Sequence, residues 1–238
     1  RYLQYLQLGV VRESLRERRI WTNIAPHMID PLLFLVPTRR TQVKRALVLS
    51  AALTAYDLLS YDRNRLDDPE KSIPPHMNLG REEALALEPG LASDDLRGAM
   101  TFMDYQMYSP ERLALECLQD AVAHGAQAAN YAAVTRFLAD AGTVTGVEVR
   151  DVFSGDTFPL RGRLVVNAGG AWADVLMAQL GGGEAHRHLV RSKGIHILTR
   201  NLTNGHALGI QTKKAHFFIL PWRGHSLIGL SLIHISEP

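Results

Sequence analysis

The sequence Leu-Val-Val-Asn-Ala-Gly-Gly-Ala-Trp, residues Leu164 to Trp172, combines three physical signals in one short run. Its first three residues form a bounded apolar run, which is typical of a strand buried on both faces. Asn167 to Gly170 then supply a polar side chain and two residues without Cβ, so the backbone can turn sharply and a ligand can approach it. We expect a helix from Ala171 to Leu180, whose N-terminal N–H groups could hold an anion or a dinucleotide. A Gly-Gly pair by itself more often marks an ordinary strand-to-helix connection.

The composition limits the classes of function. The 238 residues are 46% hydrophobic and 21% charged, which fits a globular protein with one sizeable core or two small domains. A net charge of +2 argues against a nucleic-acid partner. The single cysteine, Cys117, excludes a disulfide framework and a multi-cysteine metal site, and we interpret it as part of the core. There is no signal peptide and no apolar run of the roughly 18 residues that a membrane span needs, so we expect a cytoplasmic protein.

Both ends of the chain are unusual. The sequence starts at Arg1 without a methionine and already within an amphipathic pattern, so we expect an N-terminal portion to be missing. Residues 230–238 resemble a translated sequencing adapter, and we expect them to be a non-native tail in which His234 and Glu237 carry no function. For an internal fragment of this kind, exposed sheet edges and apolar faces predict marginal stability and aggregation.

The first hundred residues predict mainly helices. Apolar residues at helical spacing indicate an amphipathic helix over residues 2–21 and a second helix over residues 43–59. A short strand is expected over residues 32–36, closed by Pro37. The basic cluster of Arg39, Arg40, Lys44 and Arg45 is interpreted as a solvated helix start.

From Gly98 onward the pattern changes to alternating strands and helices. We expect a strand over residues 99–108, a helix from Ser109 to Gly125, and a strand over residues 127–134. A hairpin over residues 144–161 then leads into the opening stretch. A crossover helix between strands suits an α/β nucleotide-binding domain, and four later segments predict an antiparallel sheet: residues 193–199, 207–211, 216–220 and 226–229.

Six segments, in this order, resemble the FAD-dependent oxidoreductases of the D-amino-acid-oxidase superfamily, and most closely the flavin-linked glycerol-3-phosphate dehydrogenases. They are Arg1-Tyr2-Leu3; Ala25-Pro26-His27; Tyr56-Asp57; Tyr108 to Leu113; Val166 to Trp172; and Lys193-Gly194-Ile195-His196 with Leu220-Pro221-Trp222 and Leu227-Ile228-Gly229. The resemblance implies an α/β (α+β overall) fold in which two domains interleave. A partial Rossmann-like FAD-binding domain would comprise residues 1–23 and 99–180. A substrate-binding domain with an antiparallel sheet would comprise residues 24–98 and 181–229.

The resemblance also implies a cofactor, a reaction and partners. FAD would accept hydride as sn-glycerol 3-phosphate is oxidised to dihydroxyacetone phosphate, and electrons would pass to a quinone, with peripheral association at the inner face of the cytoplasmic membrane. The implied site residues are Asn167, Ala168, Gly169, Gly170 and Trp172 for the cofactor, Arg1, Tyr2 and Lys193 for the substrate, and His196 as the candidate base. The family's Gly-x-Gly-x-x-Gly turn, which would hold the pyrophosphate, does not occur in the chain.

The chemistry of these side chains agrees with the implied roles, but it leaves alternatives open. An arginine fork suits phosphate oxygens, and histidine titrates in the range that a base needs. His196 could equally be a hydrogen-bonded histidine at a strand end with no catalytic role. The histidine of the family's His-Gly-Gly segment, which this chain lacks, is an equally good candidate for the base. Arg223 and His225 are expected at a surface turn, and His27 is expected to cap local backbone. The chain could also belong to an amino-acid or 2-hydroxy-acid oxidase of the same superfamily, or be a flavin-free α/β binding module.

Overall fold

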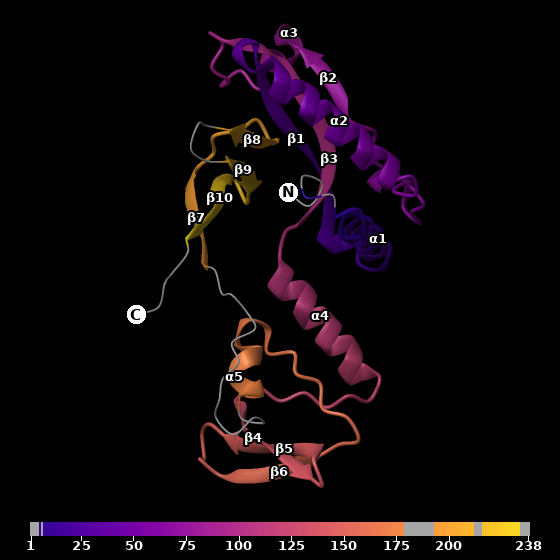
Figure 1. Cartoon of the computed structure of the whole chain (residues 1–238), viewed down its shortest axis with the longest axis vertical. Coiled ribbons are helices and arrows are strands. Elements are labelled where there is room, and N and C mark those ends of the chain that lie inside the picture. The colour runs from indigo at the N-terminus through magenta and orange to yellow at the C-terminus, as the bar shows by residue number, and fades with distance from the viewer. Residues whose placement is uncertain (1–4, 6, 179–192, 212–215, 234–238) are drawn as a thin grey trace. The chain divides into compact units, whose positions relative to one another are not determined.

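The computed structural model describes residue 5 and residues 7–178, 193–211 and 216–233 (Figure 1). Contacts divide the chain into two compact units, which are described separately. Unit 1 comprises residues 1–116 and 194–233, and unit 2 comprises residues 117–193 and 234–238. A mixed sheet and an antiparallel sheet confirm the predicted α/β class. The contact units do not follow the predicted functional domains, which remain a prediction.

Unit 1 is built on a seven-stranded sheet with the order β2-β3-β1-β8-β9-β10-β7. Its strands are β1 (Ile29–Arg39), β2 (Met77–Gly80), β3 (Leu96–Met107), β7 (Lys193–Arg200), β8 (Ala207–Gln211), β9 (His216–Trp222) and β10 (His225–Ile233). The predicted late strands are confirmed, and β10 continues into residues 230–233 of the predicted tail. β1 and β8 are parallel and pair only at Phe34 with Ala207 and at Leu35 with Leu208. This short pairing joins the two halves of the sheet.

β1 is longer than predicted and contains the proline that was expected to end it. Pro31 and Pro37 both lie inside β1, where they pair with β3. A proline has no backbone N–H, so a strand tolerates it where no neighbouring strand would accept a hydrogen bond from that position. β8 pairs with β1 only near its middle, so both prolines lie where β1 has a single partner.

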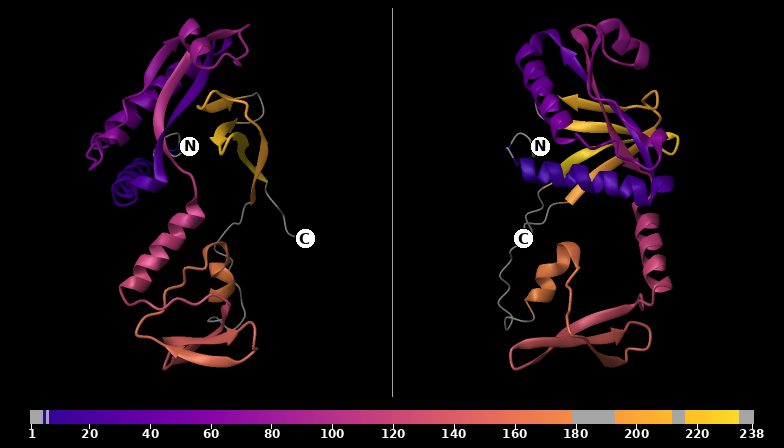
Figure 2. Two further views of the ribbon diagram at one scale, coloured as in Figure 1. Left: turned by 180° about the vertical axis from the view of Figure 1, so that it is seen from behind. Right: turned by 90° about the vertical axis from the view of Figure 1, so that its right-hand side faces the viewer.

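In the part of unit 1 that the structure describes there are three helices and the start of a fourth. They are α1 (Leu8–Ile24), α2 (Val43–Leu59), α3 (Arg81–Leu87) and the start of α4 (Pro110–Ala123), with single 3₁₀ turns η2 (Pro26–Met28), η3 (Arg40–Gln42) and η4 (Pro69–Lys71). α2 coincides with the predicted helix, and the basic cluster lies mostly exposed at its start. Figure 2 shows α2 lying along the ribbon of β1 and β3. No helix in the described part of the chain is long and apolar enough to cross a membrane.

The two faces of the sheet have different cores. On one face Leu35 is fully buried with Ala84, Ala99 and Leu208, so this face packs against α3. On the other face Phe34 stacks on Phe102 at 5.0 Å between ring centroids, and Tyr56 of α2 meets Phe102 at 6.3 Å. Aromatic pairs in these geometries add to the free energy of burial.

Unit 2 contains the antiparallel strands β4 (Ala132–Asp140), β5 (Thr143–Asp151) and β6 (Thr157–Arg161), the turn η5 (Gly170–Trp172) and the short helix α5 (Ala173–Met177). The predicted hairpin turn is confirmed, with Gly155 at a φ of +81°. The strand predicted to begin at residue 127 begins at Ala132.

Two predictions in this part of the chain are wrong. Residues 164–166 are not a strand, and Leu164 and Val166 are 79% and 76% exposed. No described strand pairs with them, and an extended segment without ladder hydrogen bonds is not a strand. Cys117 is exposed rather than in the core, because Leu113 is the residue of α4 that is buried. The predicted helix over 171–180 is described as far as Met177, with residues 179 and 180 outside the described part.

Candidate functional site

The glycine turn at 167–170 is folded by its own asparagine. The Asn167 side-chain Oδ1 accepts the N–H of Gly169 at 3.0 Å, and its Nδ2 donates to the carbonyl of Ala173 at 3.0 Å. Asparagine commonly bonds its own backbone two residues onward, which stabilises turns. Both ends of the amide are used locally, so Asn167 shapes the backbone on which a ligand would rest.

Glycine is favoured at positions 169 and 170 of this turn for two different physical reasons. A Cβ on Gly169 would lie 3.0 Å from Asn167 Oδ1 and 3.3 Å from Leu176 Cδ1, so the turn itself leaves little room for a side chain. Gly170 has a φ of +55°, and no described residue comes within 4 Å of where its Cβ would be. A left-handed φ favours glycine, and the open side of Gly170 is where a ligand can approach the main chain.

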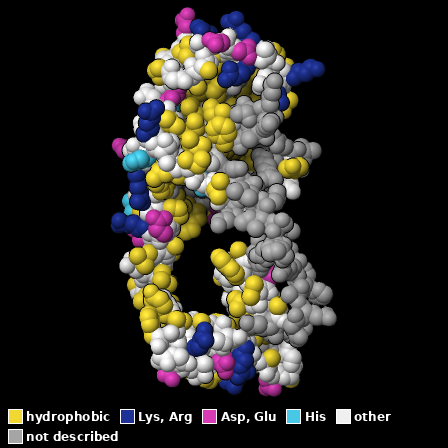
Figure 3. Space-filling model, turned by 90° about the vertical axis from the view of Figure 1, so that its left-hand side faces the viewer, with side chains coloured by type: hydrophobic (Ala, Val, Ile, Leu, Met, Phe, Trp, Pro, Cys, Tyr) yellow, Lys and Arg dark blue, Asp and Glu magenta, His cyan; other side chains and the backbone are white. Residues whose placement is uncertain are grey.

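Exposed hydrophobic side chains flank this turn. Leu164, Val166 and Trp172 are 79%, 76% and 69% exposed, and Figure 3 shows hydrophobic side chains at the surface of both units. The flat ring system of a ligand could pack on these side chains. The polar part of the same ligand could then contact the open backbone at Gly170. The residues at 164–172 therefore fit a dinucleotide-type cofactor. The helical piece that follows is short, so the predicted helix N-terminus adds little field for an anion.

His196 lies in unit 1, on β7. Its imidazole is exposed and has no hydrogen-bond partner among the described residues. The ring lies against β10, because a Cβ on Gly229 would be 2.2 Å from His196 Cδ2. A free imidazole can accept or donate a proton, so the predicted role of His196 as a base is chemically open.

His196 ends a row of residues that crosses four strands on one face of the sheet. Gly209 of β8 pairs with Phe218 of β9, and Phe218 pairs with Gly229 of β10. We call Gly209, Phe218, Gly229 and His196 the cross-strand row. Phe218 also meets Phe34 edge-on at 5.8 Å, so the row continues the aromatic face of the sheet.

The other predicted site residues lie either outside the described residues or in the other unit. Arg1 and Tyr2 lie outside the described residues, and Lys193 is described only as the first backbone position of β7. Asn167, Ala168, Gly169, Gly170 and Trp172 belong to unit 2, whereas His196 belongs to unit 1. Their roles therefore remain predictions.

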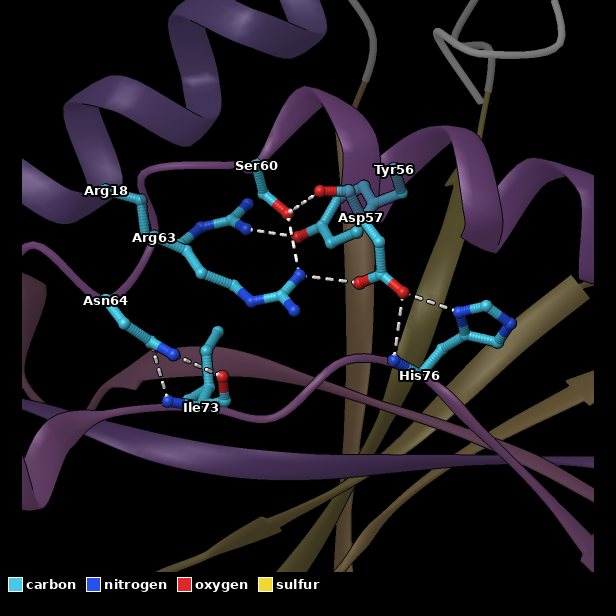
Figure 4. Close-up of polar contacts among 8 residues, drawn as sticks. All are labelled: Arg18, Tyr56, Asp57, Ser60, Arg63, Asn64, Ile73 and His76. Carbon is cyan, nitrogen blue, oxygen red and sulfur yellow. Dashed lines mark hydrogen bonds and ion pairs between the residues drawn. The ribbon is translucent and has the colours of Figure 1, made fainter.

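A half-buried polar cluster in unit 1 was anticipated only in part from the sequence (Figure 4). Arg18 of α1 donates to the hydroxyl of Tyr56 at 2.5 Å and pairs with Asp104 of β3 at 2.8 Å. Burial raises the pKa of Tyr56 to about 12, the nearby Asp104 charge adds to this, and Arg18 opposes it. Burial also raises the pKa of Asp104, against the attraction of Arg18. Tyr56 therefore stays a neutral acceptor for Arg18.

The second half of this cluster centres on Asp57. Its carboxylate accepts from Arg63 at 2.6 Å and from both the backbone and the ring Nδ1 of His76, at 3.1 and 2.6 Å. Burial alone would raise the pKa of Asp57, but these hydrogen bonds outweigh it and lower the pKa. The cluster lines a small pocket between α1, α2 and β3. Its charges are paired, so we interpret it as a support that ties the 60–76 loop to the helices.

Sequence reasoning found only part of this cluster. Tyr56-Asp57 was noted as a segment of the resemblance, without a role. Arg63 and His76 come from a loop without periodicity, so no spacing rule connects them with α2. The one signal available in the sequence was Asp57, a charged residue in the last turn of a largely apolar helix, which indicates that its carboxylate has a partner.

The turn between β9 and β10 agrees with expectation. Arg223 and His225 are exposed, and Arg223 and Gly224 have φ values of +48° and +76°, as a two-residue type I′ hairpin requires. Arg223 lies over the ring of Trp222 and donates to Ser109 Oγ at 3.1 Å. His27 does not cap backbone as predicted, because its ring pairs with Glu116 of α4 at 2.8 Å.

Comparisons with known proteins agree along almost the whole chain. A family model described as FAD dependent oxidoreductase matches residues 1–235. A glycerol-3-phosphate dehydrogenase of Mycobacterium leprae is 35% identical over 233 residues, which are 96% of this chain and 38% of that protein. One from Synechocystis is 30% identical over 242 residues, 96% of this chain and 42% of that protein. The chain thus spans about two fifths of the length of these curated relatives.

The fold is similar to that of solved structures. The glycerol-3-phosphate dehydrogenase from Bacillus halodurans, complexed with FAD, superimposes with a TM-score of 0.69 at 24% identity. The match covers 94% of this chain and 38% of that one. At this identity the likeness establishes the fold.

Proposed function

This chain belongs to the family of FAD-dependent oxidoreductases, and we propose that it forms part of an enzyme that oxidises sn-glycerol 3-phosphate to dihydroxyacetone phosphate. The observation that carries the proposal is the match along 96% of the chain to relatives named glycerol-3-phosphate dehydrogenase. Family membership confirms the resemblance stated from the six sequence segments. The substrate and the reaction are the proposal.

The residues at 164–172 would hold the cofactor. FAD, when bound, supplies the acceptor for the hydride of the carbon that carries the secondary alcohol. Asn167 fixes the turn, Gly169 lets the backbone close on itself, and Gly170 leaves the main chain open to the ligand. Exposed Trp172 would give an apolar surface beside it. The chain thus contributes shape and dispersion contacts at this site, while the redox chemistry is the cofactor's.

His196 would manage the proton of the substrate alcohol. Its imidazole is exposed and unpaired within the described part of the chain, and a base must be free to accept the hydroxyl proton as hydride leaves the carbon. Arg1 and Lys193 would bind the phosphate, since a phosphate dianion calls for several cationic groups, and Tyr2 would donate to a substrate oxygen. These three roles rest on the sequence segments alone.

The electron acceptor and the location follow as finer proposals. We infer that electrons pass to a quinone and that the enzyme associates peripherally with the inner face of the cytoplasmic membrane. Both proposals rest on the family resemblance of the sequence segments, and reduction of a soluble quinone analogue by the substrate-reduced enzyme would test the acceptor.

The test is a flavin spectrum of a chimera in which residues 1–229 replace the matched segment of the Mycobacterium leprae relative. The spectrum is recorded without oxygen, before and after glycerol 3-phosphate is added. We expect the absorbance band of the oxidised flavin to bleach. A bound flavin that stays oxidised with glycerol 3-phosphate but bleaches with an amino acid or a 2-hydroxy acid would refute the substrate.

A glycine variant in the same chimera tests the cofactor site. Gly170→Val places a branched side chain where the backbone is open, and we expect the purified protein to lose flavin. Gly170→Asn is the matched comparison for conformation, because asparagine tolerates a left-handed φ. Full flavin content in the valine variant would refute the role of this turn.

A further inference from the structure

Gly229 leaves space that the ring of His196 fills. A Cβ on Gly229 would lie 2.2 Å from His196 Cδ2, 2.8 Å from Nε2 and 3.1 Å from Cγ. Gly229 lies within β10, and its φ is outside the left-handed region. The backbone conformation at Gly229 therefore accepts any residue, and the space above it is what requires glycine.

The same arrangement recurs one step along the cross-strand row. A Cβ on Gly209 would lie 3.5 Å from Cε1 of Phe218 and 3.0 Å from Cγ2 of Val36. Phe218 thus leans over Gly209, as His196 leans over Gly229. Because Phe218 and Gly229 pair across β9 and β10, both rings lie on one face and lean toward the middle of the sheet.

We propose that Gly229 is the positioning residue for His196. Because Gly229 has no side chain, the Cγ–Cδ2–Nε2 edge of the imidazole occupies the place that a Cβ would take. Nδ1 belongs to the opposite edge of the ring, and in this proposal it is the atom that meets the substrate. The inference deepens the proposed function and rests on it for the role of His196 as the group that accepts the alcohol proton.

A side chain at position 229 would push the ring out of this place. Displacement of a reacting group by about 1 Å can cost on the order of 10²-fold in rate, and loss of a general base costs about 10²-fold or more. In the flavin-reduction assay of the chimera, we expect His196→Ala to slow reduction at least 10²-fold and Gly229→Ala to slow it at least tenfold. Both variants should change kcat rather than KM.

The first measurement is structural and needs no cofactor. In the 238-residue chain we expect a strong NOE between the His196 Hδ2 and a Gly229 Hα. The NOE should be lost in Gly229→Ala, and the His196 ring resonances should shift. Gly194→Ala is the matched control on β7, since none of the described residues lies within 4 Å of its Cβ position, and it should leave these signals unchanged.

A double-mutant cycle tests whether the His196 ring is the cause of the destabilisation in Gly229→Ala. If the His196 ring is the obstacle, Gly229→Ala should lower the melting temperature in the wild-type background and leave it unchanged in the His196→Ala background. An equal loss in both backgrounds, or no NOE in the wild type, would overturn the positioning role. If the NOE and the cycle hold while His196→Ala reduces flavin at the wild-type rate, the proposed function of His196 fails and the positioning stands.

Discussion

Leu35 is the residue whose truncation should most clearly weaken unit 1. It is fully buried and contacts Ala84, Ala99 and Leu208 in the core between the sheet and α3. Leu→Ala removes three buried carbons, which at about 0.8 kcal/mol each is ~2.4 kcal/mol of transfer free energy. The cavity left behind adds to this, so the expected cost is about 3 to 4 kcal/mol.

The position of Leu35 predicts where in the sheet the loss of stability should be greatest. Leu35 provides one of the two residue pairs through which β1 meets β8, so truncation should loosen the junction between the two halves of the sheet. At about 2–4 °C per kcal/mol for a chain of this size, the melting temperature should fall by ~6–16 °C. Native-state hydrogen exchange should show the largest loss of protection in β8.

Leu47→Ala is the control for this experiment. Leu47 lies on α2 and is 66% exposed, so its truncation should change the free energy of unfolding by less than about 0.5 kcal/mol. The reasoning is refuted if Leu35→Ala unfolds at the same temperature as Leu47→Ala, or if protection in β8 is unchanged.

Three further predictions concern a close backbone contact and two titrating groups. Gly98→Ala would place a Cβ 2.1 Å from the carbonyl oxygen of Leu79, so β2 should separate from β3 at a cost of about 1–3 kcal/mol, measured by urea unfolding. The raised pKa of Tyr56, about 12, means that the folded state holds this proton more tightly than the unfolded state. Stability should therefore fall between about pH 10 and 12, seen as a falling melting temperature. The pKa of Asp57 is lowered through His76 despite burial, so its contribution to stability is present above pH ~4 and is lost as pH falls; His76→Ala should raise the pH of acid unfolding.

Each of these has a matched comparison. Gly90→Ala meets nothing within 4 Å and should be neutral, so equal effects of the two glycine variants would contradict the contact argument. Tyr56→Phe should remove part of the loss of stability at alkaline pH. If the melting temperature of this variant falls with pH as in the wild type, Tyr56 is not the group responsible. His225→Ala changes an exposed histidine and should not move the acid midpoint; the same shift in both histidine variants would rule out the Asp57 pairing as its cause.

Local sequence signals were sufficient where neighbouring residues decide the structure. Helical periodicity placed α2 at its observed bounds, and the hairpin predicted over residues 144–161 is the observed β5–β6 hairpin. Apolar alternation and turn residues act over a few positions, so they can be read without knowing the rest of the fold. The order of six short segments was specific enough to identify the family.

Long-range pairing decided what the sequence could not. An apolar run at 164–166 looks the same whether or not a partner strand exists, and it stays exposed without one. His27 meets Glu116 across 89 positions, and Asp57 meets His76 across 19. No periodicity connects residues so far apart, because the contact is created only when helices and strands pack.

The sequence by itself determined the secondary structure of the well-patterned segments, the family and a candidate list for the site. The tertiary structure alone decided that Asn167 folds its own turn, that Gly170 is the open glycine of the pair, and that His196 lies over Gly229. The physical reason is that a missing Cβ has meaning only relative to the atom that would otherwise touch it. For Gly229 that atom belongs to a different strand of the sheet.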